Sequence, residues 1–308
     1  MSDGPEWLEE AAALWALISQ RPRGTSVATV VAQVLEHRDA QGVLAQTHGN
    51  LLGPPDLDEA RAEVRSWLSA GDLKVLSVLD EDYPAKLRAV HDAPPFIFVR
   101  GDVEVLQRGG ICVVGTRKVS PAGSERAEDA VRAVVEQGLP VLSGLAYGVD
   151  TVAHESTLRY GGTPIGVIAS SITGPYTPAA SRDLHEHVAQ AGALVSQFPP
   201  GARTHKASFL MRNATMSGLS DGTLVVEAGE SSGTRAQARN AMSHGRPVIL
   251  SQDVAVHTNW GRELASGARP NVFVVSRQED LREHVGRVRR LGSPDLGRLD
   301  AALGGGNE

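Results

Sequence analysis

The sequence predicts an α/β fold in which a small helical domain precedes a doubly wound parallel sheet. From residue 71 onward, seven short apolar runs alternate with stretches long enough for helices. Continuous apolar runs are typical of strands buried on both faces, and their repeated alternation with helices indicates a parallel sheet. Before residue 71 the apolar residues follow helical spacing instead. We therefore divide the chain into a helical N-terminal domain (1–70), a core (71–280) and a C-terminal tail (281–308) that we expect to be flexible.

Two segments of the first 70 residues carry apolar side chains at the spacing of an amphipathic helix. In the first segment these residues are Trp7, Leu8, Ala11, Leu14, Trp15 and Ile18. In the second they are Leu57, Ala60, Val64, Trp67 and Leu68. The stretch 49–55, which contains glycine and proline, predicts a break between them. Together these patterns indicate a small helical domain.

The expected strands of the core consist mostly of Val, Ile and Leu. They are Ile111–Val114, Val141–Leu142, Ile165–Ala169, Leu194–Ser196, Leu224–Glu227, Val248–Leu250 and Val272–Val275. A helix is expected after the first strand, where one apolar stripe is formed by Ala127, Ala130, Val131, Val134 and Val135. Ser120 and Pro121 just before this stripe have the residue types of an N-cap and a first helical turn.

The composition excludes several classes of protein. The chain has 308 residues, of which 41% are apolar and 21% charged, so it is neither disordered nor fibrous and can bury a core of ordinary size. Its one cysteine, Cys112, cannot form an internal disulfide, and there is no cysteine pair for zinc. We predict no cofactor and no metal site. The acidic N-terminus does not resemble a signal peptide and no 18-residue apolar run exists, so we expect a cytoplasmic protein.

The net charge of −6 argues against a protein that holds nucleic acid by positive potential over its whole surface. The charge is unevenly distributed, however. Residues 1–70 hold ten acidic residues and five arginines, whereas the other 238 residues hold 26 acidic and 25 basic residues. The core is therefore almost neutral, which is compatible with a local groove of cations.

Ligands of open α/β sheets bind beyond the carboxyl ends of the strands, so the turn after each strand is informative. The turn after the first strand, Gly115–Ser120, offers a glycine, two hydroxyls and the Arg117 guanidinium before a helix N-terminus. This is phosphate-binding chemistry, although the spacing of the GxGxxG and Walker A motifs is absent. A loop with a solvated arginine would have the same composition.

The turn after the second strand begins with Ser143 and Gly144 and suits a nest of backbone amides that binds an anion. Asp150 and His154 follow one helical turn apart. A helix cap and a buried structural histidine explain this pair better than a functional role.

Two further segments offer groups for an anion. Ser232, Gly233 and Thr234 open a helix after the fifth strand, where the alternative is an ordinary cap. In the segment 209–214, an arginine and an asparagine at a helix start could meet phosphates or base edges, whereas a surface arginine is the alternative. Because the strand-end turns share one sheet edge, we expect them to converge on one crevice.

Several blocks of the sequence, in the same order, resemble the DprA/Smf family of DNA-processing proteins. The similarity covers about residues 80–268. The blocks are Asp80–Leu87, Pro94–Gly101 with a short strand between, Gly115–Ser120, Ser143–His154, Tyr176–Pro178, the Arg212–Asn213 helix start and the Ser232–Thr234 turn.

The resemblance implies an extended Rossmann-like core that binds single-stranded DNA and helps to load the recombinase RecA during natural transformation and recombination. Members usually form a homodimer and are not known as nucleotide hydrolases. The residues expected to bind nucleic acid are Gly115, Thr116, Arg117, Ser120, Ser143, Gly144, Tyr147, Phe209, Arg212, Asn213, Ser232, Gly233 and Thr234. Arg117 and Arg212 would pair with phosphate, and the Tyr147 ring could stack on a base.

The sequence departs from the family pattern at two expected arginines. Tyr147 and Ala214 occupy these positions. Since each departure removes a cation, we expect weaker and less salt-dependent DNA binding than in a typical member.

A nucleotide-binding or nucleotide-cleaving protein in a stress or phage-defence role is the main alternative. The segment 231–234 loosely resembles the P-G-G-x-G-T-x-x-E motif of phosphoribohydrolases. In place of the catalytic glutamate of that motif stands Gln237, which cannot act as an acid or base. This disfavours catalysis, leaving Asp150 and Glu227 as the carboxylates near the strand ends. A further alternative is a protein-binding role for the acidic helical domain.

Overall fold

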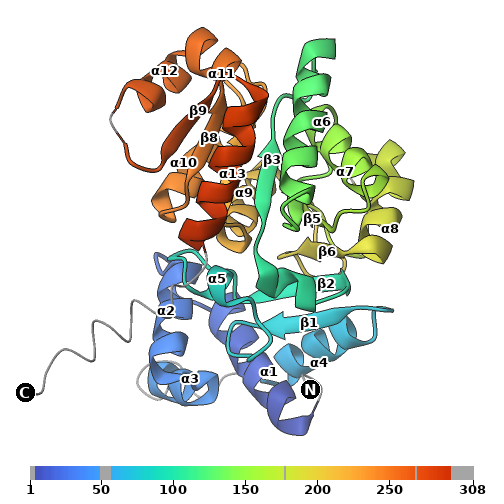
Figure 1. Ribbon diagram of the computed structural model, residues 1–308. Coiled ribbons are helices and arrows are strands. Elements are labelled where there is room, and N and C mark those ends of the chain that lie inside the picture. Colours follow the sequence, from blue (N-terminus) through green and yellow to red (C-terminus); the bar gives the residue numbers. More distant parts are fainter. Residues whose placement is uncertain (1–3, 49–56, 177, 268, 293–308) are drawn as a thin grey trace, which may run out of the picture.

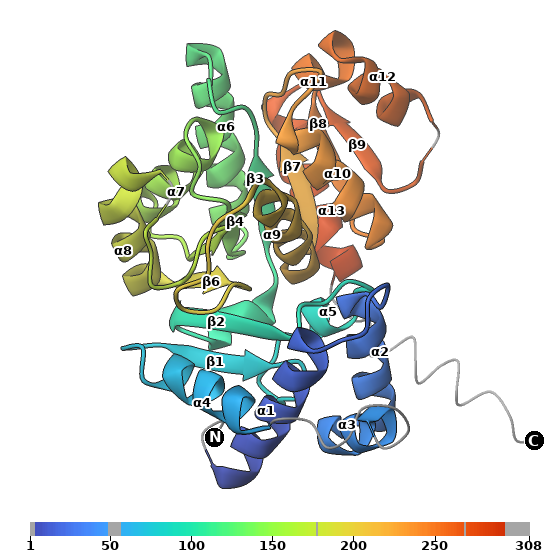
Figure 2. The same ribbon diagram turned by 180° about the vertical axis from the view of Figure 1, so that it is seen from behind.

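The computed structural model describes residues 4–48, 57–176, 178–267 and 269–292. The predicted α/β class is confirmed: one nine-stranded sheet is covered by helices on both faces (Figures 1 and 2). The strands are β1 (Lys74–Ser77), β2 (Phe96–Gly101), β3 (Ile111–Val114), β4 (Val141–Ser143), β5 (Pro164–Ile168), β6 (Ala193–Ser196), β7 (Gly222–Val225), β8 (Val248–Ser251) and β9 (Val272–Val275).

Helices connect the strands and also form the N-terminal region. They are α1 (Pro5–Ser19), α2 (Val27–His37), α3 (Ala40–His48), α4 (Leu57–Leu68), α5 (Ala85–Arg88), α6 (Pro121–Val135), α7 (Val149–Arg159), α8 (Arg182–Ala191), α9 (Lys206–Leu219), α10 (Gly233–Ser243), α11 (Gln252–His257), α12 (Asn259–Ser266) and α13 (Gln278–Gly292). Two short 3₁₀ helices are η1 (Glu104–Arg108) and η2 (Ala179–Ser181). The predicted break at 49–55 and the glycine-rich end lie outside the described residues.

The strand order in the sheet is β1-β2-β6-β5-β4-β3-β7-β8-β9. The seven strands from β3 to β9 pair in parallel and are the seven that the sequence predicts. β1 and β2 extend one edge in antiparallel pairing. β1 was not predicted, because its four residues begin with an exposed lysine and end with serine.

Residues of β3 alternate between the two faces of the sheet. Ile111 and Val113 pack with α6, α7 and α13 on one face. Cys112 and Val114 join the core that contains α10 residues on the other face. Figure 1 shows α6 and α13 in front of the sheet, and Figure 2 shows α9 and α10 on the reverse side. Such burial on both faces explains why these strands lack polar alternation.

The helices of residues 1–70 share a core with the antiparallel edge of the sheet. The ring centroid of Trp67 lies 4.9 Å from that of Trp15, 5.2 Å from Phe96 and 5.3 Å from Phe98. Aromatic pairs in this edge-to-face arrangement contribute about 0.5–1.5 kcal/mol each beyond the burial of their surface. Figure 1 shows α1 to α4 gathered beside β1 and β2, below the rest of the sheet.

The expectation of a flexible tail is wrong for residues 281–292. They belong to α13, which lies against α6 and β9. Leu281, Val285 and Val288 are buried there at helical spacing. The apolar stripe is narrow and surrounded by arginines, which concealed it in the sequence. The tail residues beyond 292 lie outside the described part of the chain.

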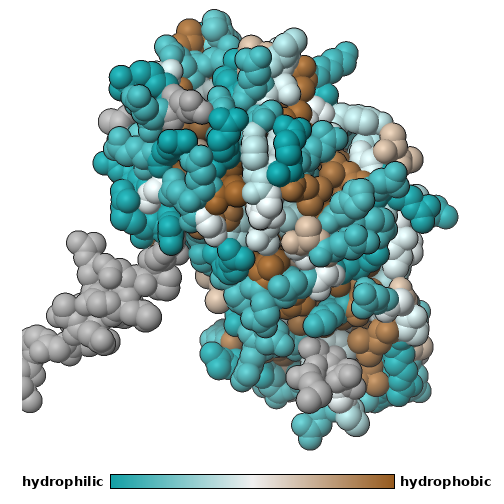
Figure 3. All heavy atoms as spheres, turned by 45° about the vertical axis from the view of Figure 1, so that its right-hand side comes forward, coloured by the Kyte–Doolittle hydropathy of each residue, from teal (hydrophilic) through white to brown (hydrophobic). Residues whose placement is uncertain are grey.

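Apolar side chains on the surface are dispersed. Figure 3 shows a mainly hydrophilic face on which hydrophobic residues form separate spots. Dispersed apolar residues of this kind are normal on a folded chain. Within the described residues, no helix has the length and apolar character needed to cross a membrane.

Candidate functional site

The sheet has a switch point between β3 and β7, which are neighbours in parallel pairing. The chain leaves β3 toward α6, which packs on one face, and leaves β7 toward α10, which packs on the other. In open α/β sheets such a point leaves a crevice beyond the carboxyl ends of the strands. A pocket of about 440 Å³ opens here, and we call it the switch-point pocket.

Most of the residues expected to bind nucleic acid line this pocket. They are Gly115, Thr116, Arg117, Phe209, Arg212, Asn213, Ser232, Gly233 and Thr234. The other lining residues were not expected to bind nucleic acid, and they are Val114, Ala146, Asp150, Met216, Ser231 and Gln237. Thus turns after β3, β4 and β7 and the first half of α9 converge on one crevice.

The turn after β3 is held in place by contacts with Val149 and Glu227. A side chain at Gly115 would overlap Val149 and the Glu227 backbone, so the chain must approach closely at this point. The Thr116 amide donates to the Glu227 carbonyl at 2.7 Å, and its own carbonyl accepts from the Val149 amide at 3.1 Å. The side chains of the next two residues, Arg117 and Lys118, are exposed. Lys118 was not predicted to contribute, although it adds a second cation to this turn.

Arg117 reaches across the pocket to α9. Its guanidinium carbon lies 5.4 Å from the centre of the Phe209 ring, which is cation–π geometry. No described residue forms an ion pair with Arg117. This exposed guanidinium therefore keeps its hydrogen-bond donors for a ligand.

The start of α10 is open to the pocket. Ser232 occupies the N-cap position, but no side chain caps the helix. The Ser232 hydroxyl is buried and has no hydrogen-bond partner among the described residues. The Thr234 hydroxyl donates to the Gly115 carbonyl at 3.0 Å, and the Asn213 amide donates to the Gly233 carbonyl at 3.3 Å. These two bonds fix the helix start beside β3 and α9 without covering its first amides.

Arg212 is a buried cation with an internal partner. Its Nη1 atom lies 3.9 Å from the Asp150 carboxylate and 3.4 Å from the Val167 carbonyl. A side chain at Gly144 would overlap the guanidinium, so glycine is required for this packing. Burial raises the pKa of Asp150 and lowers that of Arg212, while the attraction between the two groups opposes both changes. The cation predicted to meet phosphate is thus already paired within the chain.

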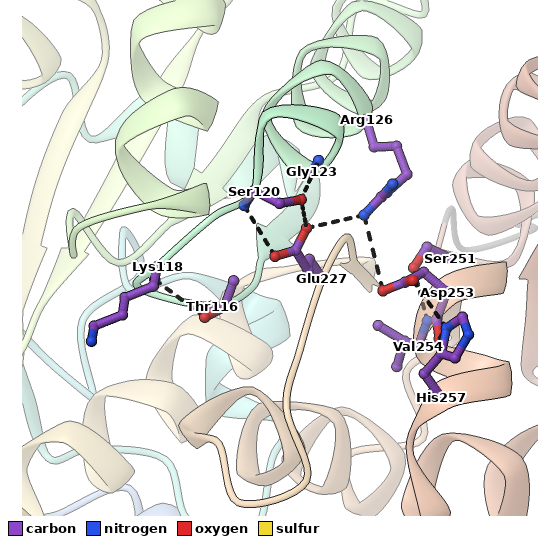
Figure 4. A network of polar contacts seen from close by, with 10 residues as sticks. All are labelled: Thr116, Lys118, Ser120, Gly123, Arg126, Glu227, Ser251, Asp253, Val254 and His257. Carbon is purple, nitrogen blue, oxygen red and sulfur yellow. Dashed lines mark hydrogen bonds and ion pairs between the residues drawn. The ribbon is translucent and has the colours of Figure 1, made fainter.

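Ser120 forms the predicted cap of α6 and also holds Glu227 (Figure 4). Its hydroxyl accepts from the Gly123 amide at 2.9 Å and donates to Glu227 Oε2 at 2.6 Å. The Ser120 amide and Arg126 donate to the same carboxylate at 3.1 Å and 3.0 Å. Figure 4 shows this carboxylate turned toward Ser120 and Arg126 at the start of α6. The Ser120 hydroxyl is therefore engaged inside the protein.

Three other residues expected to bind nucleic acid lie outside the pocket lining, at the end of β4 and in the turn after it. Ser143 is fully buried and donates to the Val113 carbonyl at 2.7 Å. Gly144 is buried under Arg212. Tyr147 is 52% exposed and follows Ala146, which does line the pocket. Burial lowers the pKa of the nearby His154 to about 4, so its imidazole is neutral at pH 7. The expected helix cap at Asp150 is wrong, because Gly148 holds the N-cap position of α7 and no side chain caps this helix.

A family model described as DNA recombination-mediator protein A matches residues 74–272. The chain is 33% identical over 178 residues to the DNA processing protein DprA of Bacillus subtilis, covering 58% of this chain and 60% of that protein. It is 35% identical over 173 residues to DprA of Streptococcus pneumoniae, covering 56% and 61%. The match thus spans about 60% of the length of these relatives.

Two solved structures have the same fold. DNA processing protein A from Streptococcus pneumoniae superposes with a TM-score of 0.70 and 25% identity, covering 90% of this chain and 95% of that one. The protein from Helicobacter pylori, whose structure describes its single-stranded DNA binding mode, superposes with a TM-score of 0.61 and 23% identity. The latter similarity covers 70% of this chain and 96% of that one.

Proposed function

Because the chain belongs to the DNA recombination-mediator protein A family, we propose that it binds single-stranded DNA in the switch-point pocket. One observation carries the proposal: the uncapped start of α10 and the exposed Arg117 line the same pocket. A helix N-terminus and an arginine are both favourable partners for a phosphate group. The related protein from Helicobacter pylori has a single-stranded DNA binding mode.

Successive phosphates of one strand would contact these two groups. The amides of Gly233 and Thr234 are the first of α10, and the positive end of the helix dipole faces the pocket. Arg117 offers parallel N–H donors that fit a phosphate bidentately. Neither contact involves a base edge, so binding would not depend on sequence.

Apolar side chains near the pocket supply surfaces for bases. Phe209 lines the pocket, and Tyr147, which is 52% exposed, follows the lining residue Ala146. Stacking of a base on an aromatic ring contributes about 1–3 kcal/mol and tolerates every base. Because few cations take part, the affinity would depend only modestly on salt.

We also propose that the protein acts by binding and not by catalysis. The two carboxylates nearest the strand ends support this, because both already have partners. Glu227 is held by Ser120 and Arg126, and Asp150 lies beside Arg212. Gln237 donates to Thr223 at the base of the pocket. None of these groups is placed as a free general base.

Replacing Arg117 with alanine tests the site. We expect the affinity for a fluorescent poly-dT oligonucleotide to fall about five- to tenfold, and the slope of log affinity against log salt to fall by about one. Arg65→Ala on α4, far from the pocket, is the matched control and should leave both quantities unchanged. Equal losses in the two variants, or no loss in Arg117→Ala, would place the DNA elsewhere.

A competition experiment distinguishes DNA from a mononucleotide as the ligand of the pocket. Unlabelled poly-dT should displace the fluorescent strand, whereas duplex DNA and AMP should not. Displacement by AMP at a concentration near that of the oligonucleotide would favour a mononucleotide as the ligand of the pocket.

The partners and the location that follow from the family are part of the proposal. We infer a homodimer that hands single-stranded DNA to RecA in the cytoplasm, where such DNA would be found. Size-exclusion chromatography with light scattering tests the dimer. Capture of purified RecA with and without poly-dT tests the second step, and failure of capture under both conditions would remove RecA from the proposal.

A further inference from the structure

A second cluster of polar side chains lies at the opposite end of α10. His91 and Asp92 belong to the turn between α5 and β2, and His244 immediately follows α10. One ligand atom of each residue lies within 4.8 Å of the others. No other group of three or more histidine, cysteine or acidic residues in the described chain has this property.

His244 is held in a fixed orientation. Its side chain is fully buried, with Nε2 2.8 Å from Asp92 Oδ1 and Nδ1 2.9 Å from Ser217 Oγ. The serine hydroxyl can donate or accept, so it satisfies Nδ1 in either tautomer. At 2.8 Å from the Asp92 carboxylate, Nε2 carries the proton and donates it to Asp92. A metal ion would displace this proton, and Nδ1–H would then donate to the Ser217 hydroxyl. A partner on the second ring nitrogen is characteristic of histidines that bind metals.

His91 covers the same position from the solvent side. Its ring is exposed and lies 5.3 Å from the His244 ring in an edge-on arrangement. Two nitrogen or oxygen ligands of one zinc ion are at most roughly 4.4 Å apart, since each bond is about 2.0–2.2 Å. Rotation of the exposed His91 side chain is therefore enough to complete a three-ligand site.

The cluster is separate from the switch-point pocket. The eleven residues of α10 lie between them, which corresponds to roughly 16 Å of helix. Figure 1 shows α5 at the lower end of the sheet, whereas α11 and α12, which follow β8, lie at the upper end. Nearby Lys86 is paired with Asp221, so its charge is compensated within the chain.

We propose that His91, Asp92 and His244 bind a divalent transition-metal ion of the Zn²⁺ type. Two imidazoles and one carboxylate suit Zn²⁺, Co²⁺ or Ni²⁺, whereas Mg²⁺ and Ca²⁺ prefer oxygen ligands alone. Asp92 and His244 are 152 positions apart in the sequence, so the ion would join the turn after α5 to the end of α10. The remaining coordination positions would hold water. This site does not depend on the proposed DNA binding.

Titration of the untagged full-length protein, freed of metal by a chelator, tests the site. We expect saturable binding of one Zn²⁺ per chain by calorimetry, and a visible absorption band when Co²⁺ is the probe. His91→Ala should weaken Zn²⁺ binding at least about tenfold. Because His91 is exposed, this variant should fold normally, as circular dichroism and poly-dT binding would verify.

The matched control is His257→Ala. His257 is also an exposed histidine beside a carboxylate, with Nδ1 3.0 Å from Asp253 Oδ1. Within the described residues, however, it belongs to no group of three histidine, cysteine or acidic side chains with ligand atoms this close. This variant should bind Zn²⁺ as the unmodified protein does. The proposal is overturned if no saturable site is found, or if His91→Ala and His257→Ala bind Zn²⁺ equally well.

Discussion

The starts of α6 and α7 differ from the start of α10 in what faces the positive end of each helix. Ser120 and the Glu227 carboxylate occupy the start of α6, and Asp150 lies in the first turn of α7. α10 has no acidic residue in its first turn and no side-chain cap. Glu230, shortly before it in the chain, instead accepts from the Asn259 amide. All three helices begin after a turn that follows a strand, but two of their starts already hold an anion of the protein itself.

This difference indicates where an external anion can bind. A carboxylate at a helix start contributes about 0.3–2 kcal/mol and repels a second negative group. Phosphate would therefore bind beside α10, while the other two helix starts contribute to the stability of the fold. Each variant below either breaks this distinction or sharpens it.

The largest change in the free energy of unfolding is expected for Arg212→Ala. It leaves the buried Asp150 carboxylate without its cation, which should lower the free energy of unfolding by about 3–5 kcal/mol. Urea denaturation measures this loss. Adding Asp150→Asn to the Arg212→Ala variant removes the unpaired carboxylate charge. The double variant should therefore recover part of the lost free energy of unfolding. A stable Arg212→Ala protein with greatly weakened poly-dT binding would instead make Arg212 a direct phosphate contact.

A smaller loss of stability is expected for Glu227→Ala. The change removes bonds from Ser120 and Arg126 to a carboxylate, which should cost about 2 kcal/mol. Affinity for poly-dT should stay within about twofold, because this anion lies at α6. Glu155→Ala, at an exposed position on α7, is the control, with a stability change below about 0.5 kcal/mol. Tighter DNA binding by Glu227→Ala would show that the start of α6 also accepts phosphate.

The smallest change in the free energy of unfolding is expected for Gly233→Asp at the start of α10. A side chain at this glycine meets no atom within 4 Å, so the protein should accommodate it. The new carboxylate should stabilise the fold by about 0.5 kcal/mol and weaken poly-dT binding roughly tenfold. Gly233→Asn has nearly the same size without the charge and should bind nearly normally. Equal affinities for these two variants would argue against phosphate at this helix.

The parallel strands could be predicted because burial on both faces leaves continuous apolar runs, as in β3. The rule that ligands bind at the carboxyl ends of strands also led to Gly115, Arg117 and Ser232 in the pocket lining. β1 could not be predicted, since only Val75 and Leu76 are apolar in its four residues.

Pairings between distant residues were beyond sequence analysis. Ser120 and Glu227 are 107 positions apart, and neither residue type indicates the other. The same is true of Asp92 and His244, which have no recognisable ligand spacing. In the sequence Arg212 is indistinguishable from an exposed cation, because only the folded chain brings Asp150 and Gly144 against it.

The stacking of Arg117 on Phe209 has a consequence for conformational entropy. An arginine side chain carries about 2 kcal/mol of rotamer entropy, and ordering such a side chain on association costs about 0.5–1.5 kcal/mol. In the free protein the Phe209 ring already restricts Arg117, so part of this loss occurs during folding. The guanidinium carbon lies 5.4 Å from the ring centre, and no described residue forms an ion pair with this arginine. The side chain that we propose to contact a phosphate would thus be partly ordered before the ligand arrives.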